Sequence, residues 1–172
     1  MFAIFNLLSE LFLDAQVDVL VGDENVLQGL VFQDPAMKSY LNSFPEVLFI
    51  DATYKLLEIR VPIYLTLCED SMGNSEVVLV GMLTVEDEES LIWMFNTLCA
   101  RNTRMNSARV ILTDKDLTER KVLRKVFPYS RLLLCLFHTL RTFRREVMCE
   151  KMTMRATVWH MQEGPIESLH SL

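Results

Sequence analysis

Three apolar segments in the middle of the chain have the length and composition of β-strands. They are Val47–Lys55, Ile63–Cys68 and Glu76–Thr84, all rich in Val, Leu and Ile. Pro62 falls at the start of the second segment, where its missing N–H does least harm, and residues 70–74 have the composition of a hairpin turn. The pattern predicts three strands joined as an antiparallel meander.

After residue 84 the apolar residues recur at helical spacing. Thr84 to Glu89 supplies a capping residue and an acidic first turn, and Leu91, Phe95 and Leu98 follow on one face. The remaining predicted elements are a fourth strand Ala108–Thr113, a second helix Leu117–Phe127, a fifth strand Arg131–Leu134 and a third helix ending near Cys149. The order β-β-β-α-β-α-β predicts an α/β fold, a mixed five-stranded sheet flanked by helices.

Weaker patterns precede and follow this core. Residues 1–14 have the spacing of a short amphipathic helix, and residues 17–21 and 26–32 read as short extended pieces, followed by a turn or short helix from Asp34 through Tyr40. We expect this lead-in to pack on the main sheet. We therefore divide the chain into a lead-in segment 1–43, a main domain 44–150 and an irregular tail 151–172.

Composition narrows the class of protein. The chain has 172 residues, of which 51% are hydrophobic and 23% charged, so it can bury a core and is not a disordered tail. Its longest apolar runs are far shorter than the ~20 residues of a membrane-spanning helix, and its N-terminus lacks the features of a secretory signal. The four scattered cysteines suit a reducing compartment better than a disulfide framework.

Charge is distributed unevenly along the chain. Residues 1–100 hold 3 Lys/Arg and 16 Asp/Glu, whereas residues 101–155 hold 14 and 5, within a total of −6. The basic half either offers a surface for phosphates or an acidic partner, or it pairs with the acidic half internally. The overall acidity argues against tight, autonomous binding of nucleic acid. The basic strip consists of Arg120, Lys121, Arg124, Lys125, Arg141, Arg144 and Arg145.

Two acids belong to strands that the topology can bring together. Asp51 lies within the first strand of the meander, and Asp114 follows the fourth strand. A right-handed crossover allows these two strands to pair in parallel, which would place both carboxylates at one edge of the sheet. Such a pair is the minimum needed to hold a divalent cation. Alternatively, Asp114 or Asp116 only caps the helix that follows.

Three motifs resemble those of Mutator-like transposase domains. Phe49 to Lys55 resembles the first acidic motif, Leu112 to Asp116 the second, and Cys135 to His138 the Cys-x-x-His signature, in the family's order. The resemblance implies a ribonuclease H-like fold, and in active members an Asp-Asp-Glu triad with a divalent metal. The composition looks most like the domesticated domain of the SWIM-type zinc-finger proteins, members one and three, which implies a nuclear protein.

The family's third acid has no clear counterpart in this chain. Glu146 and Glu150 are the only acids on or just after the third helix, and beside Arg144 and Arg145 they read as surface charge. The Cys-x-Cys and Cys-x-His pairs of the SWIM motif are absent as well. We therefore expect a fragment or a short form of a longer protein.

Cys135 and His138 allow two interpretations. A thiolate and an imidazole separated by two residues form half of a Zn²⁺ site, for which Cys149 and His160 are candidate partners. Alternatively, Cys135 ends a buried strand and His138 caps the sheet or a helix, which the irregular spacing favours.

These observations lead to three functional hypotheses. The first is a catalytically silent ribonuclease H-like domain that contacts nuclear proteins or DNA. The second is a transposase or nuclease fragment that binds Mg²⁺ through Asp51 and Asp114. The third is a pure interaction module that uses the basic strip. None of them involves a membrane, and the sequence does not identify the partner.

Overall fold

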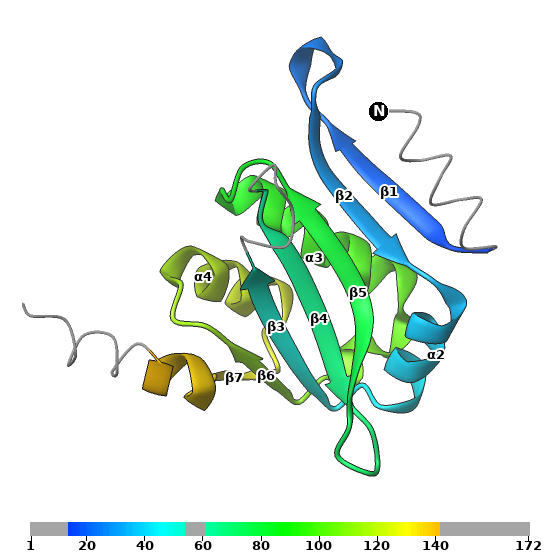
Figure 1. The fold of residues 1–172 in the computed structure, drawn as a ribbon, viewed down its shortest axis with the longest axis vertical. Coiled ribbons are helices and arrows are strands. Elements are labelled where there is room, and N and C mark those ends of the chain that lie inside the picture. Colours follow the sequence, from blue (N-terminus) through cyan, green and yellow to red (C-terminus); the bar gives the residue numbers. More distant parts are fainter. Residues whose placement is uncertain (1–13, 54–60, 142–172) are drawn as a thin grey trace, which may run out of the picture.

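A computed structural model describes residues 14–53 and 61–141, which form one mixed sheet and its helices (Figure 1). The strands are β1 Gln16–Val21, β2 Leu27–Gln33, β3 Val47–Thr53, β4 Ile63–Glu69, β5 Ser75–Leu83, β6 Val110–Thr113 and β7 Arg131–Leu134. The α-helices are α2 Pro35–Ser43, α3 Glu88–Arg101 and α4 Leu117–Val126, and short 3-10 turns cover Asp23–Asn25 and Thr103–Ser107. Residues 136–141 begin a further helix.

The sheet follows the predicted topology and extends it. Its order is β1-β2-β5-β4-β3-β6-β7, with β3, β4 and β5 antiparallel, β6 parallel to β3 and β7 parallel to β6. The predicted mixed α/β fold is therefore confirmed. The predicted number of five strands is wrong, because the described residues form seven.

The two additional strands come from the lead-in segment. β1 and β2 form an antiparallel hairpin, and β2 pairs antiparallel with the free edge of β5. Because an exposed edge leaves a row of backbone donors and acceptors unpaired, pairing at this edge satisfies groups that packing on a face would not. The lead-in strands thus extend the sheet instead of packing on it.

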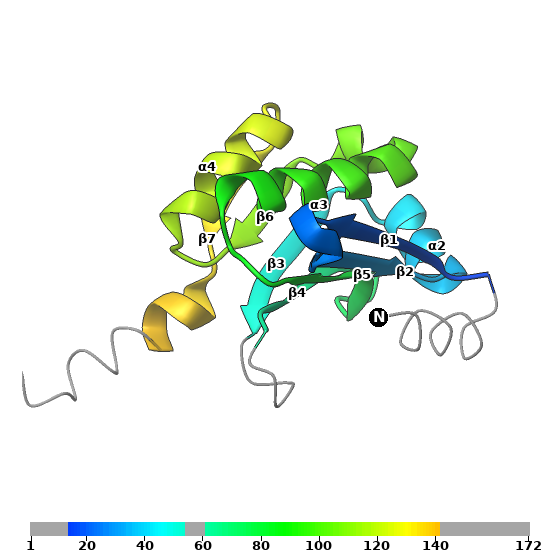
Figure 2. The ribbon, with the colours of Figure 1, turned by 90° about the horizontal axis from the view of Figure 1, so that it is seen from above.

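Helices α3 and α4 lie on the same face of the sheet, which we call the inner face (Figure 2). Helix α3 begins where Asp87 accepts a hydrogen bond from the Ser90 N–H at 2.8 Å. Thr84, at the start of the predicted capping segment, instead donates its N–H to the Gln28 carbonyl at 2.8 Å. None of the helices in the described part of the chain is long and apolar enough to cross a membrane.

The core fills the space between the inner face and these helices. Leu48 and Ile50 of β3 are buried in it, so the residues that alternate with them, Phe49 and Asp51, belong to the opposite, outer face. The rings of Phe95 and Phe127 meet edge to face with centroids 6.3 Å apart and join α3 to the end of α4. The positions of Asp51 and Asp114 therefore depend on the register of their strands and on the alternation of side chains between the two faces.

Candidate functional site

Asp51 lies in β3, and Asp114 directly follows β6, the strand that pairs in parallel with β3. The register pairs Val47 with Val110 and Phe49 with Leu112, and the same offset two residues further on aligns Asp51 with Asp114. The predicted parallel pairing of these strands is thus confirmed. Asp51 lies in the last part of β3 and Asp114 directly after β6, so both lie toward the carboxyl ends of these two strands.

Asp114 does not cap the helix that follows it. Asp116 is the N-cap of α4, and its Oδ1 accepts a hydrogen bond from the Glu119 N–H at 2.8 Å. Asp114 Oδ1 accepts one from the neighbouring Lys115 N–H at 2.6 Å. Capping therefore does not account for the position of Asp114.

Asp51 faces the histidine of the Cys-x-x-His element. Cys135 continues the β7 ladder, since its N–H donates to the Thr113 carbonyl at 2.9 Å, and the chain then turns into the helical residues 136–141. This turn brings His138 Nε2 to 3.4 Å from Asp51 Oδ1. The Asp51 side chain is 36% exposed, so it lies at the surface of the outer face and is not enclosed in the core.

Glu119, in the first turn of α4, is a buried carboxyl group close enough to Asp51 and Asp114 for their charges to act on it. It is 3% exposed, and its Oε1 accepts a hydrogen bond from the Thr113 hydroxyl. Burial, followed by the negative charges of Asp116, Asp114, Glu86 and Asp51 in that order, raises the pKa of Glu119 to about 8. The group is therefore mostly protonated at neutral pH.

The sequence did contain a signal for Glu119. It occupies the first position of the stripe Glu119, Val122, Leu123 and Val126, whose i, i+3, i+4, i+7 spacing faces the core. The sequence alone does not distinguish this buried acid, because an acid in the first turn of a helix is an ordinary surface feature.

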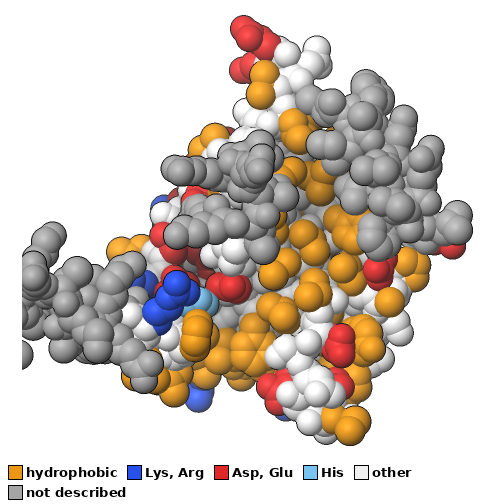
Figure 3. Space-filling view, in the orientation of Figure 1, with side chains coloured by type: hydrophobic (Ala, Val, Ile, Leu, Met, Phe, Trp, Pro, Cys, Tyr) orange, Lys and Arg blue, Asp and Glu red, His pale blue; other side chains and the backbone are white. Residues whose placement is uncertain are grey.

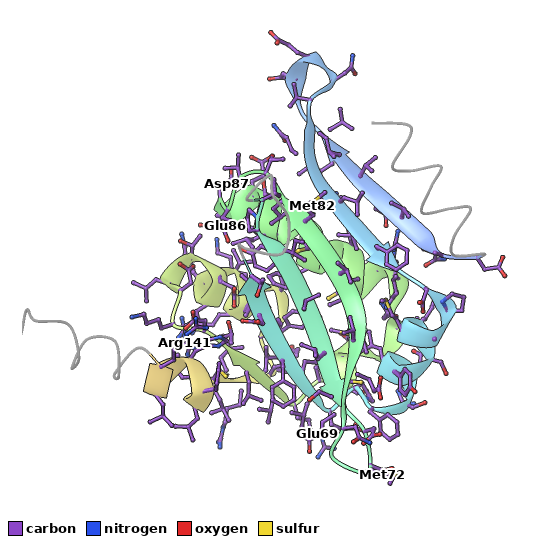
Figure 4. The ribbon with its side chains drawn as sticks, in the orientation of Figure 1. Glu69, Met72, Met82, Glu86, Asp87 and Arg141 are labelled. Atoms are coloured by element: carbon purple, nitrogen blue, oxygen red, sulfur yellow. The ribbon has the colours of Figure 1, made fainter. Side chains whose placement is uncertain are left out.

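A fifth acid completes the acidic cluster, which we define as Asp51, Glu86, Asp114, Asp116 and Glu119. Glu86 lies in the loop before α3, and its Oε1 accepts a hydrogen bond from the Tyr64 hydroxyl at 2.5 Å. In Figure 4, Glu86 lies above and Arg141 below the end of β3. Figure 3 shows acidic and basic side chains gathered in the same region of the outer face.

The acidic cluster does not fit the three-carboxylate cation site that the resemblance implies. Within residues 14–53 and 61–141 no three or more His, Cys, Asp or Glu side chains form a group that could hold a metal ion. One oxygen of Asp51 faces His138, and the Glu119 carboxyl is protonated and bonded to Thr113. Only Asp51 and Asp114 are in register for such a cation. For Zn²⁺, His138 is directed at Asp51, and the candidate partners Cys149 and His160 lie outside the described residues.

The described residues of the basic strip fall into two groups: those that bind partners within the domain and those that are exposed without an ion pair. Lys121 and Lys125 form ion pairs with Glu88 of α3, and the Lys121 Nζ lies 2.5 Å from a Glu88 oxygen. These pairs join the acidic and basic halves of the chain internally, which is one of the two alternatives that the charge pattern allows. Arg120 Nη1 donates to the Leu133 carbonyl at 3.5 Å, and Arg124 and Arg141 are exposed. The strip available to a partner is therefore smaller than the sequence predicted.

Several predicted residues lie outside the described part of the chain. They are Arg144, Arg145, Glu146, Cys149, Glu150 and His160. The predicted N-terminal helix and most of the third helix lie outside it as well.

Comparison with known proteins matches the chain to one family model and to curated relatives. Residues 10–133 match a family described as "Zinc finger SWIM domain-containing protein 1/3, RNaseH-like domain". "Protein FAR1-RELATED SEQUENCE 6" of Arabidopsis thaliana is 26% identical over 121 residues, 70% of this chain and 17% of the relative. "PKS-NRPS hybrid synthetase cheA" of Chaetomium globosum is 22% identical over 120 residues, 69% of this chain and 3% of the relative. The chain thus spans only a small part of either protein.

Proposed function

The chain belongs to the family of RNase H-like domains found in zinc finger SWIM domain-containing proteins 1 and 3, and on this premise we propose that it is a catalytically silent domain acting in the nucleus through contacts with protein or nucleic acid. The family match and the FAR1-related relative confirm the predicted ribonuclease H-like, transposase-derived class.

The arrangement around Asp51 is the observation that carries the proposal. A cation held between two strands needs carboxylate oxygens that are charged and directed at it. Here Asp51 faces His138 at 3.4 Å, and the neighbouring acid Glu119 is buried and mostly protonated at neutral pH. Asp51 and Asp114 follow the register of a nuclease pair, but no three acids among the described residues form a group that could hold a metal ion.

Plasmid nicking tests the loss of catalysis. The full chain is incubated with supercoiled DNA in millimolar Mg²⁺ or Mn²⁺, beside the double variant Asp51→Asn, Asp114→Asn. We expect equal, background nicking by both proteins. Nicking by the unmodified chain that the double variant lacks would establish the alternative, a metal-dependent nuclease, which the register of the two acids favours.

Charge reversal tests the contact surface. Arg124 and Arg141 are exposed and have no ion pair among the described residues, so a phosphate or an acidic protein can reach them without displacing an internal partner. We expect Arg124→Glu with Arg141→Glu to weaken binding of short duplex DNA or of an acidic partner at least tenfold at low salt. Arg104→Glu changes the charge of an exposed arginine outside the strip and should have little effect. Equal affinities for all variants would contradict a role for the strip.

A further inference from the structure

A groove runs along β1, between this strand and α3. β1 is the terminal strand of the sheet in the described part of the chain, where it pairs with β2 on one side. Figure 2 shows β1 beside α3. The groove consists of two neighbouring pockets, of about 680 and 460 Å³, which are both lined by Trp93. It therefore joins an edge of the sheet to one side of a helix.

Local spacing explains which side chains line the groove. On α3 the lining residues recur every three or four positions and so share one side of the helix: Glu89, Trp93, Thr97 and Ala100. On β1, Leu20 lies opposite Gly29, where an added Cβ would be 2.9 Å from the Trp93 ring. Leu20 and Trp93 thus lie on the same face of the sheet, and Trp93 separates the two pockets.

The strand side of the groove has exposed apolar residues. Val19, Val21 and Val85 are 43%, 42% and 52% exposed, and each lines one of the two pockets. A sheet edge with exposed apolar side chains is a place where another strand can pair. Because a strand rises about 3.3 Å per residue, residues 17–21 offer about 16 Å of edge. This length suits an extended segment of five or six residues.

The lining of the groove is mainly acidic. Its basic side chain, Arg101, already pairs with Asp18. At the other end of the groove, Asp23, Asp87 and Glu89 are exposed and form no ion pair among the described residues. Negative charge disfavours phosphate groups and favours a cationic side chain. The groove therefore differs in chemistry from the basic strip and suits a basic peptide.

We propose that this groove binds an extended peptide of a partner protein. The peptide pairs with β1, places an apolar side chain beside Trp93, and places a Lys or Arg beside Asp23, Asp87 and Glu89. In this mode of recognition, main-chain hydrogen bonds to the sheet edge supply affinity, and pockets beside the edge select alternate side chains. A second copy that paired through its own β1 would bring two acidic linings together, so charge favours a basic partner.

Peptide display tests the proposal. A phage library of random linear octapeptides is selected against the full chain, and the affinities of the selected peptides are measured with synthetic copies. We expect peptides in which apolar residues alternate and a Lys or Arg lies near one end. Failure to select such peptides would overturn the proposal.

Variants of the chain test the acidic end of the groove. Asp23→Asn with Glu89→Gln should weaken the selected peptides roughly fivefold, because two exposed ion pairs are lost. Glu46→Gln with Glu69→Gln is the matched control, since both acids are exposed at the end of the sheet opposite Asp87 (Figure 4). Norleucine in place of the basic residue of the peptide should remove the difference. Equal affinities of the two double variants for the original peptides would overturn the proposal.

N-methylated peptides test the pairing with β1. Successive N–H groups of a strand point to opposite sides, so methylation of alternate residues removes the donors on one side only. We expect one of the two complementary methylated peptides to lose binding and the other to keep it, and equal effects would overturn strand pairing. Self-association of the chain that Asp23→Asn with Glu89→Gln changes would mean that a second copy occupies the groove, which would also overturn the proposal. Arg124→Glu with Arg141→Glu should leave peptide affinity unchanged, so the groove is tested independently of the basic strip.

Discussion

Glu119 places an ionisable group inside the core at the base of α4. It is 3% exposed and lies close enough to four other acids for their charges to act on it. A charged carboxylate in that position would be poorly solvated and repelled, so the side chain holds its proton to about pH 8. One residue thus couples the stability of the fold to pH.

The sign of this coupling follows from the two protonation states. An unfolded glutamate loses its proton near pH 4.5, whereas the folded one holds it to about pH 8, so unfolding releases a proton between those values. The free energy of unfolding should therefore fall as pH rises through this window. Glu119→Gln has no proton to lose and keeps an oxygen for the Thr113 hydroxyl. We expect the variant to match the unmodified chain near pH 4.5 and to exceed it by a few kcal/mol above pH 8.

Urea denaturation at a series of pH values measures the effect. If the free energies of unfolding of the unmodified chain and of Glu119→Gln change in parallel from pH 4.5 to 8.5, Glu119 is not protonated in the folded state.

Thr66 is a buried residue whose hydroxyl is unsatisfied. Its side chain is 1% exposed, and its Oγ1 has no hydrogen-bond partner among the described residues. Valine has the same shape without the hydroxyl, so Thr66→Val should raise the free energy of unfolding by about 1–2 kcal/mol. Thr113→Val is the matched control, because the hydroxyl of Thr113 is bonded to Glu119 and its removal should destabilise. Destabilisation by Thr66→Val in the same denaturation assay would contradict this assignment.

At the scale of elements, α4 depends on the acid two residues beyond Asp114. Asp116→Ala removes the N-cap bond to the Glu119 N–H and should lower the free energy of unfolding by about 1 kcal/mol. Asp114→Ala removes the same charge from the same loop without removing a cap, so its effect should be smaller. Thermal melts compare the two variants, and equal losses would mean that charge, not capping, stabilises the start of the helix.

Most elements of the domain could be predicted because their local patterns agree with their tertiary roles. The bounds predicted for β7, Arg131–Leu134, are those observed, and the turn at residues 70–74 is closed by Asp70, which accepts from the Met72 and Asn74 N–H groups at 2.8 Å each. The parallel pairing of β3 with β6 followed from element order and crossover handedness.

The remaining features depend on contacts between segments that are distant in sequence. Nothing local in residues 27–33 reveals that β2 pairs with β5, because an apolar run of that length can pack on a face or extend an edge. The contact between His138 and Asp51 likewise depends on the turn after β7. At the candidate site, the sequence identified the two aligned acids but not the buried Glu119.

At the scale of the whole molecule, the opposite charges of the two halves are partly neutralised inside the domain. Glu88 lies between Lys121 and Lys125, and Arg101 pairs with Asp18 of β1. These pairs join the acidic first part of the chain to the basic second part across the α3–α4 and α3–β1 contacts. Within the basic strip, Arg124 and Arg141 are exposed members that form no ion pair among the described residues.

A catalytically silent domain requires that Asp51 and Asp114 no longer form a cation site. A cation bound by the folded state alone would stabilise it by RT ln(1 + [L]/Kd), about 2.7 kcal/mol at a hundred times Kd, which corresponds to a rise of several degrees in melting temperature. The measurement is the melting temperature of the full chain from 0 to 10 mM Mn²⁺, beside the double variant Asp51→Asn, Asp114→Asn. We predict curves of the same shape, without a saturable rise for either protein. A saturable rise for the unmodified chain that the double variant lacks would contradict the claim.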